Sequence, residues 1–168
     1  LAQFVERAPL ADRKTPRDDI WLEPNESPGF VVRETNIAVG NALRRRLSKY
    51  GLTLGQYYIM RALWINEGQS QRALSKAVGT TEPTTASVLR ILEKNGLVRR
   101  TRNQQDRRTI NIFPTERGLE MKRELLLMAM GVNEIATRGL FQHDIEEIKR
   151  LMRAMSENLR ADEENTSD

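Results

Sequence analysis

The sequence predicts a mainly α-helical fold with a small β-hairpin wing, and two observations carry this prediction. First, apolar residues recur at helical spacing in a series of segments, and these segments are bounded by Ser, Thr and Gly residues typical of helix ends. Second, two short runs of β type, LVRRTRN (residues 97–103) and TINIFPT (residues 109–115), are joined by a few polar residues, which indicates a hairpin. The 168 residues suffice for one domain with additional helices.

The segment before the hairpin is expected to form an irregular arm and then four helices. Residues 1–29 contain four of the six prolines, which predicts an arm without regular structure. Ser27 is placed to cap the first helix, with Pro28 at its first position. The later helices begin near a Thr, a Ser or an acidic residue, and glycines follow their ends. The expected helices cover residues 28–50, 53–68, 71–78 and 82–95.

Two more helices are expected after the hairpin, with more apolar surface than one small domain can bury. Thr115 is placed to begin the first, whose run LLLMAM (residues 125–130) is apolar all round and so expected to be buried on more than one side. The last helix has a single apolar stripe, and the polar tail of residues 161–168 is expected to be disordered. A homodimer is therefore expected, with residues 30–50 and 116–160 as dimerisation helices. The stripe consists of Ile145, Ile148, Leu151, Met152, Met155 and Leu159.

The composition argues against several classes of protein. There is no cysteine and a single histidine, His143, so disulfides, zinc fingers and thiol-based sensing are excluded. Because no phosphate-binding loop, GxGxxG, HExxH or histidine-assisted nucleophile occurs, we expect neither an enzyme nor a bound metal or cofactor. No apolar run approaches the roughly 20 residues that cross a bilayer, and the first residues lack the features of a secretory signal. A cytoplasmic protein without a membrane partner is expected.

The positive charge is concentrated in one block of the chain. Residues 30–108 hold 15 Lys and Arg against 5 Asp and Glu, a net charge of +10, whereas the segments on either side are net acidic. Such a block favours a polyanionic partner, of which nucleic acid is the commonest, although a solvated basic surface would have the same composition.

A short helix, a turn, a second helix and a hairpin together predict a winged helix-turn-helix over residues 51–115, in which the second helix enters the major groove of double-stranded DNA. At 100° per residue, one face of this second helix must be the core, and the opposite face has small residues, hydroxyls and an arginine suited to guanine. Glu82 at its start either complements the helix dipole, which is favoured, or accepts from a cytosine amino group. The core face holds Thr85, Val88, Leu89 and Leu92, and the opposite face holds Pro83, Ser87 and Arg90 with Thr84 and Ala86 at its margins.

The hairpin supplies a second candidate contact with DNA. Its arginines are Arg99, Arg100 and Arg102 on the first strand and Arg107 and Arg108 just past the tip. An arginine on a narrow hairpin can enter the minor groove, where negative potential is concentrated, although diffuse contacts to phosphates are the alternative. Asp106 is expected to hydrogen-bond a neighbouring arginine and to fix its direction.

Three segments have a pattern typical of one family of regulators: residues 51–63 (GLTLGQYYIMRAL), 71–100 (QRALSKAVGTTEPTTASVLRILEKNGLVRR) and 106–118 (DRRTINIFPTERG). Through them the sequence resembles, from about Phe30 to Leu159, the MarR family of multiple-antibiotic-resistance regulators. The resemblance implies that Asp106 positions the wing arginine, that Arg108 lies in the minor groove and that the recognition positions are Pro83, Thr84, Ser87 and Arg90. It also implies an obligate dimer joined through its first and last two helices, in most cases a repressor that a ligand, often phenolic, releases. The long arm and Pro114, where Leu is usual, depart from the family pattern.

The resemblance also implies an effector pocket between the dimerisation helices and the winged region. On the second helix Tyr57, Met60, Arg61 and Trp64 form a mixed aromatic and cationic stripe, which plain core packing would also explain. We expect a small aromatic carboxylate, with the guanidinium of Arg61 for the carboxylate and aromatic rings for the body of the ligand. An aromatic acyl-coenzyme A is the alternative, with the run Arg44, Arg45 and Arg46 as a candidate phosphate contact, although a solvated basic face is the favoured interpretation of this run. The candidate ligand residues are Tyr57, Tyr58, Arg61, Trp64, Arg33 and Asn36.

The sequence therefore predicts a DNA-binding regulator, most simply a repressor of an inverted-repeat operator that a small aromatic effector releases. The alternative is a winged-helix module that binds nucleic acid or protein without an effector.

Overall fold

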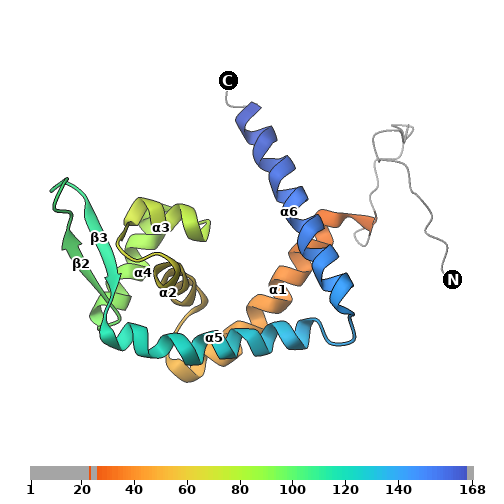
Figure 1. The fold of residues 1–168 in the computed structure, drawn as a ribbon, viewed down its shortest axis with the longest axis horizontal. Helices are drawn as coiled ribbons and strands as arrows, with labels where there is room; N and C mark the ends of the chain where they lie inside the picture. Colours follow the sequence, from red (N-terminus) through yellow and green to blue (C-terminus); the bar gives the residue numbers. More distant parts are fainter. Residues whose placement is uncertain (1–22, 24–25, 166–168) are drawn as a thin grey trace. The chain divides into compact units, whose positions relative to one another are not determined.

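The computed structural model describes residue 23 and residues 26–165, and these form helices and one small sheet (Figure 1). The chain divides into two compact units, residues 1–37 and residues 38–168. The first unit contains the predicted arm, most of which lies outside the described residues, and the start of α1. In chain order the elements are α1 (Pro28–Leu47), the 3-10 helix η3 (Ser48–Tyr50), α2 (Leu54–Ile65), β1 (Gln69–Ser70), α3 (Gln71–Val78), α4 (Glu82–Lys94), β2 (Val98–Arg102), β3 (Ile110–Pro114), α5 (Glu116–Ala136) and α6 (Gln142–Asn165).

The helix starts follow from side-chain caps, as the sequence predicts. Thr53 and Gln56 form a reciprocal capping box at the start of α2, and Ser70 accepts from the third residue of α3. Thr81 and Thr115 cap α4 and α5 in the same way. Each hydroxyl satisfies one of the backbone N–H groups that have no partner within the helix, which fixes where the helix begins.

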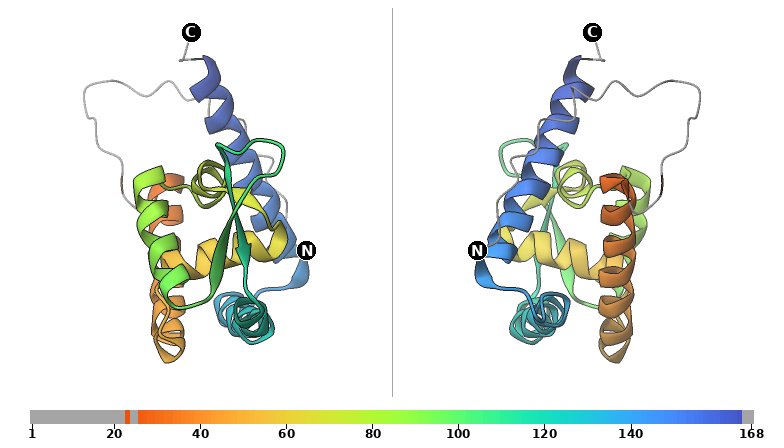
Figure 2. Two further views of the ribbon diagram at one scale, coloured as in Figure 1. Left: turned by 90° about the vertical axis from the view of Figure 1, so that its left-hand side faces the viewer. Right: turned by 90° about the vertical axis from the view of Figure 1, so that its right-hand side faces the viewer.

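The sheet is larger than the predicted hairpin by one short strand. Its order is β1-β3-β2, and both pairs are antiparallel. Ile112 in the central strand lies opposite Gln69 on one side and Arg100 on the other. Figures 1 and 2 show that the β2–β3 hairpin projects from α2, α3 and α4, with its tip at the end far from α5.

The second unit has a core that α2, α3, α4 and the sheet build together. The side chains of Leu63, Leu74, Leu89, Leu92 and Ile112 are almost completely buried in it. The winged helix-turn-helix region therefore has a packed core, which holds the exposed side chains of α4 and the hairpin in place.

The start of α5 is joined closely to this core. The indole N–H of Trp64 donates to the carbonyl of Gly118 (3.0 Å), and the Thr115 hydroxyl donates to the carbonyl of Gly96 (2.6 Å). A Cβ on Gly118 would lie 2.3 Å from the carbonyl oxygen of Leu97, so only glycine allows this approach of helix to strand.

Two expectations about the last helices need correction. In the LLLMAM run only Leu125 and Ala129 are buried, whereas Leu127 and Met130 are about half exposed, so the run is not buried on several sides within one chain. The tail predicted to be disordered from residue 161 is helical as far as Asn165. Ala and Glu are good helix formers, and extending an existing helix requires no new nucleus. None of the described helices is both long enough and apolar enough to cross a membrane.

Candidate nucleic-acid interface and effector pocket

The face of α4 predicted to meet DNA is exposed. Thr85, Leu89 and Leu92 are completely buried, and the hydroxyl of Thr85 is satisfied because it donates to the carbonyl of Thr81. The opposite face is open to solvent, as the helical periodicity predicts, and it carries Pro83, Thr84, Ser87 and Arg90. An additional residue of this face escaped the sequence reasoning: Ile91 is 48% exposed, four positions after Ser87.

The hydroxyls on this face already have partners. The Oγ1 atoms of Thr84 and Thr81 lie 2.9 Å apart in a hydrogen bond, and the hydroxyl of Ser87 donates to the carbonyl of Pro83 (3.1 Å). By contrast, the guanidinium of Arg90 makes no hydrogen bond or ion pair with any described residue, and it remains free to act as a donor.

Helices α3 and α4 form the helix-turn-helix. α3 ends at Gly79, whose φ of 65° lies in the left-handed region that favours glycine, and the chain then turns into the Thr81 cap of α4. The side-chain amide of Gln71 donates to the carbonyl of Glu82 (3.4 Å), which links the two helix starts. The side chain of Glu82 is exposed in the first turn of α4, a position suited to the favoured role of complementing the helix dipole.

Two of the five wing arginines are engaged within the chain. The guanidinium of Arg99 lies 4.7 Å from the centre of the Phe113 ring and donates to the Thr101 hydroxyl (2.8 Å). Arg100 forms an ion pair with Glu93 of α4 (3.1 Å). These arginines join the wing to its own strands and to α4, so they contribute less to a DNA surface than the sequence alone indicates.

The tip of the wing is held by two side chains that accept backbone hydrogen bonds. The Oδ1 of Asn103 accepts from the N–H groups of Gln105 (2.8 Å) and Asp106 (3.0 Å). The carboxylate of Asp106 accepts from the backbone N–H of Arg108 (3.0 Å) and from the hydroxyl of Thr109 (2.6 Å). The Thr109 and Arg108 hydrogen bonds stabilise the carboxylate and lower the pKa of Asp106 below its ordinary value.

Asp106 therefore acts on the backbone of the turn. The expected hydrogen bond between Asp106 and a neighbouring arginine is present, but it comes from the main-chain N–H of Arg108 and not from its guanidinium. Within the described residues, the guanidinium groups of Arg102, Arg107 and Arg108 make no hydrogen bond or ion pair. The fixed turn thus presents unpaired cations at the end of the hairpin.

The aromatic stripe of α2 is divided between the core and a pocket. Tyr57 is completely buried, and its ring packs edge-on against Trp64 with 6.5 Å between centroids. The Tyr57 hydroxyl is buried without a hydrogen-bond partner among the described residues. Because the indole of Trp64 is bonded to Gly118, both aromatic residues form part of the core, and the core-packing alternative holds for them.

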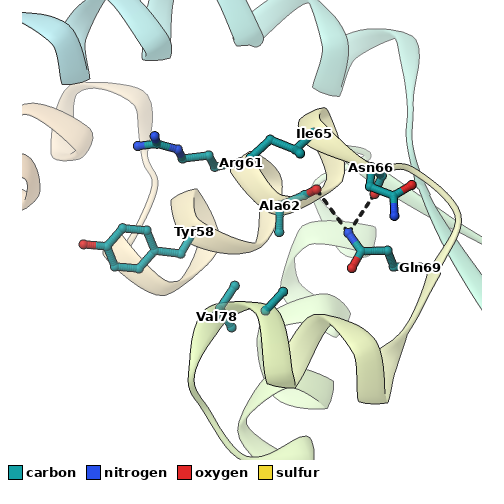
Figure 3. A pocket seen from close by; sticks show the side chains of 8 residues that line it. Tyr58, Arg61, Ala62, Ile65, Asn66, Gln69 and Val78 are labelled. Atoms are coloured by element: carbon teal, nitrogen blue, oxygen red, sulfur yellow. Dashed lines mark hydrogen bonds between the residues drawn. The ribbon is translucent and has the colours of Figure 1, made fainter. Parts of the chain in front are cut away.

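Tyr58 and Arg61, one turn of the helix apart, line a cavity of about 420 Å³ between α2 and α3 (Figure 3). Its apolar wall includes Ile65 and Val78. The side-chain amide of Gln69 borders the cavity and donates to the carbonyls of Ala62 (3.1 Å) and Asn66 (2.7 Å) at the end of α2. Arg61 is exposed and makes no ion pair in the described part of the chain.

The remaining candidate ligand residues belong to the first unit. Arg33 and Asn36 are exposed on the part of α1 that belongs to the first unit, and Arg33 pairs with the adjacent Glu34 (2.9 Å). Their part in a ligand site remains a prediction from the sequence.

Comparison with known proteins agrees with this geometry. The model of the MarR family matches residues 52–110. The regulator TtmR of Methylorubrum extorquens is 34% identical over 93 residues, which cover 55% of this chain and about half (48%) of TtmR. The regulator SarZ of Staphylococcus epidermidis is 32% identical over 108 residues, which cover 63% of this chain and 73% of SarZ.

Solved structures share the fold. A MarR transcriptional regulator from Methanosarcina mazei Go1 superposes with a TM-score of 0.72 at 25% identity, covering 77% of this chain and 94% of that one. CouR from Rhodococcus jostii RHA1, solved with bound p-coumaroyl-CoA, gives a TM-score of 0.72 at 21% identity, covering 79% and 94%.

A capped helix pair, a three-stranded sheet with a projecting hairpin and an open basic face on the second helix define a winged helix-turn-helix DNA-binding protein. The chain belongs to the MarR family, and it carries the DNA-binding region of a MarR-type transcriptional regulator.

Proposed function

We propose that the chain acts as a dimeric repressor on an inverted-repeat operator and that a small aromatic carboxylate releases it. The observation that carries the DNA contact is that Arg90 on α4 and Arg107 and Arg108 on the wing are exposed and unpaired in the described structure. Unpaired guanidinium groups on two adjacent elements can bind a major-groove edge and the neighbouring minor groove without first breaking an internal bond.

The wing gives the sharpest test of this proposal. Arg108→Ala should weaken operator binding by about 1–3 kcal/mol, the usual value of one specific arginine contact. Arg138→Ala, which removes the same charge from the segment between α5 and α6, should change the affinity by much less. Both are measured by fluorescence anisotropy at one fixed salt concentration, because phosphate contacts depend steeply on salt. Equal affinities for the two variants would show that the wing does not enter the groove.

The cavity beside α2 supports the choice of effector. Its volume of about 420 Å³ lies within the usual range for small-molecule sites, roughly 300–1,000 Å³. Arg61 supplies a guanidinium for a carboxylate, Tyr58 an aromatic face and a hydroxyl, and Ile65 and Val78 an apolar wall. Compared with the sequence-based proposal, Tyr58 takes the place of Tyr57 and Trp64, because these two are in the core.

Calorimetry with benzoate, hydroxybenzoate and methoxybenzoate tests this pocket. Binding should be lost in Arg61→Ala and kept in Arg72→Ala, which removes an exposed arginine from α3. A ligand that reduces DNA affinity tenfold requires about 1.4 kcal/mol of coupling, and the operator must then weaken ligand binding by the same factor. Unchanged binding to Arg61→Ala would rule the pocket out.

An aromatic acyl-coenzyme A is the second candidate effector. CouR, which shares the fold, was solved with p-coumaroyl-CoA, and this chain has three consecutive arginines at the end of α1. Benzoyl-coenzyme A in the same calorimeter separates the two classes. If neither class of ligand shifts both thermal stability and operator affinity, a regulator without an effector becomes the better description.

A further inference from the structure

The DNA-facing side of α4 has an exposed apolar residue toward the margin that Thr84 occupies. Ile91 is 48% exposed, and its helical position lies between those of Ser87 and Thr84 on the face opposite the core. The other large aliphatic residues of this helix, Leu89 and Leu92, are completely buried. Ile91 therefore contributes little to the core, and a major-groove partner would cover it.

The polar groups around Ile91 offer little hydrogen-bonding capacity to a base. The Thr84 hydroxyl is bonded to that of Thr81, and the Ser87 hydroxyl donates its proton to the carbonyl of Pro83, so Ser87 keeps only acceptor capacity. Pro83 presents an apolar ring. Apart from the cationic groups of Arg90 and Lys94, the groups available around Ile91 are mainly hydrocarbon.

Apolar groups distinguish bases in the major groove through one feature. Thymine alone presents a methyl group there, on its C5 atom, and aliphatic side chains and the threonine methyl are suited to contact it. Guanine and adenine are read through hydrogen bonds, for which Arg90 and Lys94, both exposed on this face, have donors without a partner among the described residues.

We propose that Ile91, assisted by the methyl group of Thr84, selects thymine in each operator half-site by contact with its C5 methyl. The inference rests on the proposed function, because it requires that α4 enters the major groove. It deepens that function by assigning the chemistry of one recognised base, with Arg90 left to recognise guanine nearby.

Uracil provides the test, because it pairs as thymine does and lacks only the methyl group. An operator is first selected with the full chain from random duplexes, and each thymine is then replaced by uracil in turn. At one or more symmetric positions the dissociation constant of the wild type should rise about fourfold per half-site, the effect of losing one buried methyl group.

The variants make the assignment specific to the residue. Ile91→Ala should bind the thymine and uracil duplexes equally well at those positions, while Glu67→Ala, which truncates an exposed side chain between α2 and β1, should keep the wild-type preference. Circular dichroism checks that Ile91→Ala is folded, as expected for an exposed side chain.

The outcomes are distinguishable. If an operator is selected but no thymine is sensitive to uracil, or if Ile91→Ala keeps the full sensitivity, the inference is wrong and the proposed function stands. If no duplex is selected at any salt concentration, both are overturned.

Discussion

The winged region and α6 have the same kind of amphipathic pattern, but only the winged region covers its apolar face within the chain. In residues 52–118 the apolar residues of α2, α3, α4 and the sheet pack against one another, and Leu74 and Leu89 are completely buried. In α6 none of the described residues is buried, and Leu151 and Leu159 are 46% and 65% exposed.

This difference shows what a hydrophobic pattern specifies. The pattern says that a helix has an apolar face, but it does not say whether the same chain covers it. Between α5 and α6 lies a hollow of about 570 Å³, whose lining includes Met130, Ile145 and Ile148. Contiguous apolar surface of this kind favours an interface, which supports the proposed homodimer through these helices.

The largest expected effect comes from charging the uncovered face. Leu151→Glu combined with Leu159→Glu would place unpaired carboxylates in the proposed interface, which should weaken the dimer by about 4 kcal/mol or more, or about 1,000-fold. Light scattering should show the mass fall from about twice 19.3 kDa to the mass of one chain. The winged region should stay folded, because its core is complete within the chain.

Ile65→Glu provides the matched control, because Ile65 is 80% exposed but lies on α2. It should leave the mass unchanged. A double variant that remains dimeric would place the interface elsewhere and would remove the basis of the comparison.

The next largest effect tests how tightly the start of α5 packs against the winged region. Gly118→Ala should lower the free energy of unfolding by about 3 kcal/mol, since its Cβ would lie 2.3 Å from the Leu97 carbonyl oxygen and strand or helix must shift. Gly55→Ala, whose Cβ has only an ordinary contact of 3.8 Å with Val88, should be neutral or slightly stabilising. Urea unfolding followed by circular dichroism compares them, and similar stabilities would mean that the helix–strand contact is not tight.

A smaller effect is expected from the wing tip. Asp106→Ala removes the acceptor for the Arg108 N–H and the Thr109 hydroxyl, so the turn should loosen and operator affinity should fall by about 1 kcal/mol. Asp106→Asn keeps one acceptor oxygen, so its operator affinity should lie between those of the wild type and Asp106→Ala. Anisotropy titrations measure the affinities. Equal losses with Asn and Ala, which both remove the carboxylate charge, would point to the charge, and not the turn, as the cause.

The smallest expected effect is a shift in the pKa of Tyr50, where η3 contacts α5. The Tyr50 hydroxyl donates to the carboxylate of Glu124 (3.0 Å), and this hydrogen bond raises the pKa of Tyr50 above its ordinary value of about 10. Since the folded pKa is raised, the stabilisation is present below pH 10 and is lost as the pH rises through the folded value. The difference in ultraviolet titration between the wild type and Tyr50→Phe should give a midpoint above 10, and Glu124→Gln should lower it. An unchanged midpoint in Glu124→Gln would assign the shift to burial.

Local signals in the sequence predicted most of the fold. Caps such as Thr53 and Thr81 and the glycine that ends α3 mark the helices, because each acts within one turn of its own position. The strand β1 was missed, because two residues show no alternation and pair only with the distant β3.

The site was predicted less completely for a related reason. Helical spacing identified the open face of α4 but could not assign Tyr57 and Trp64 to the core, because core and pocket aromatic residues have the same period. Nor could it show that Arg100 would pair with Glu93, a contact between strand and helix that depends on how they pack.

The fixed start of α5 has a mechanical consequence. Hydrogen bonds from side chains and backbone join the start of this helix to Trp64, Gly96 and Leu97. We therefore expect the winged region and the helix to tilt together as one rigid body. With 21 residues, α5 is about 30 Å long, and a tilt of about 5° at one end displaces the other by about 3 Å. That displacement is close to the rise of one base pair, about 3.4 Å. In the proposed dimer, a slight rotation at the interface would therefore suffice to move a recognition helix out of register with its proposed half-site.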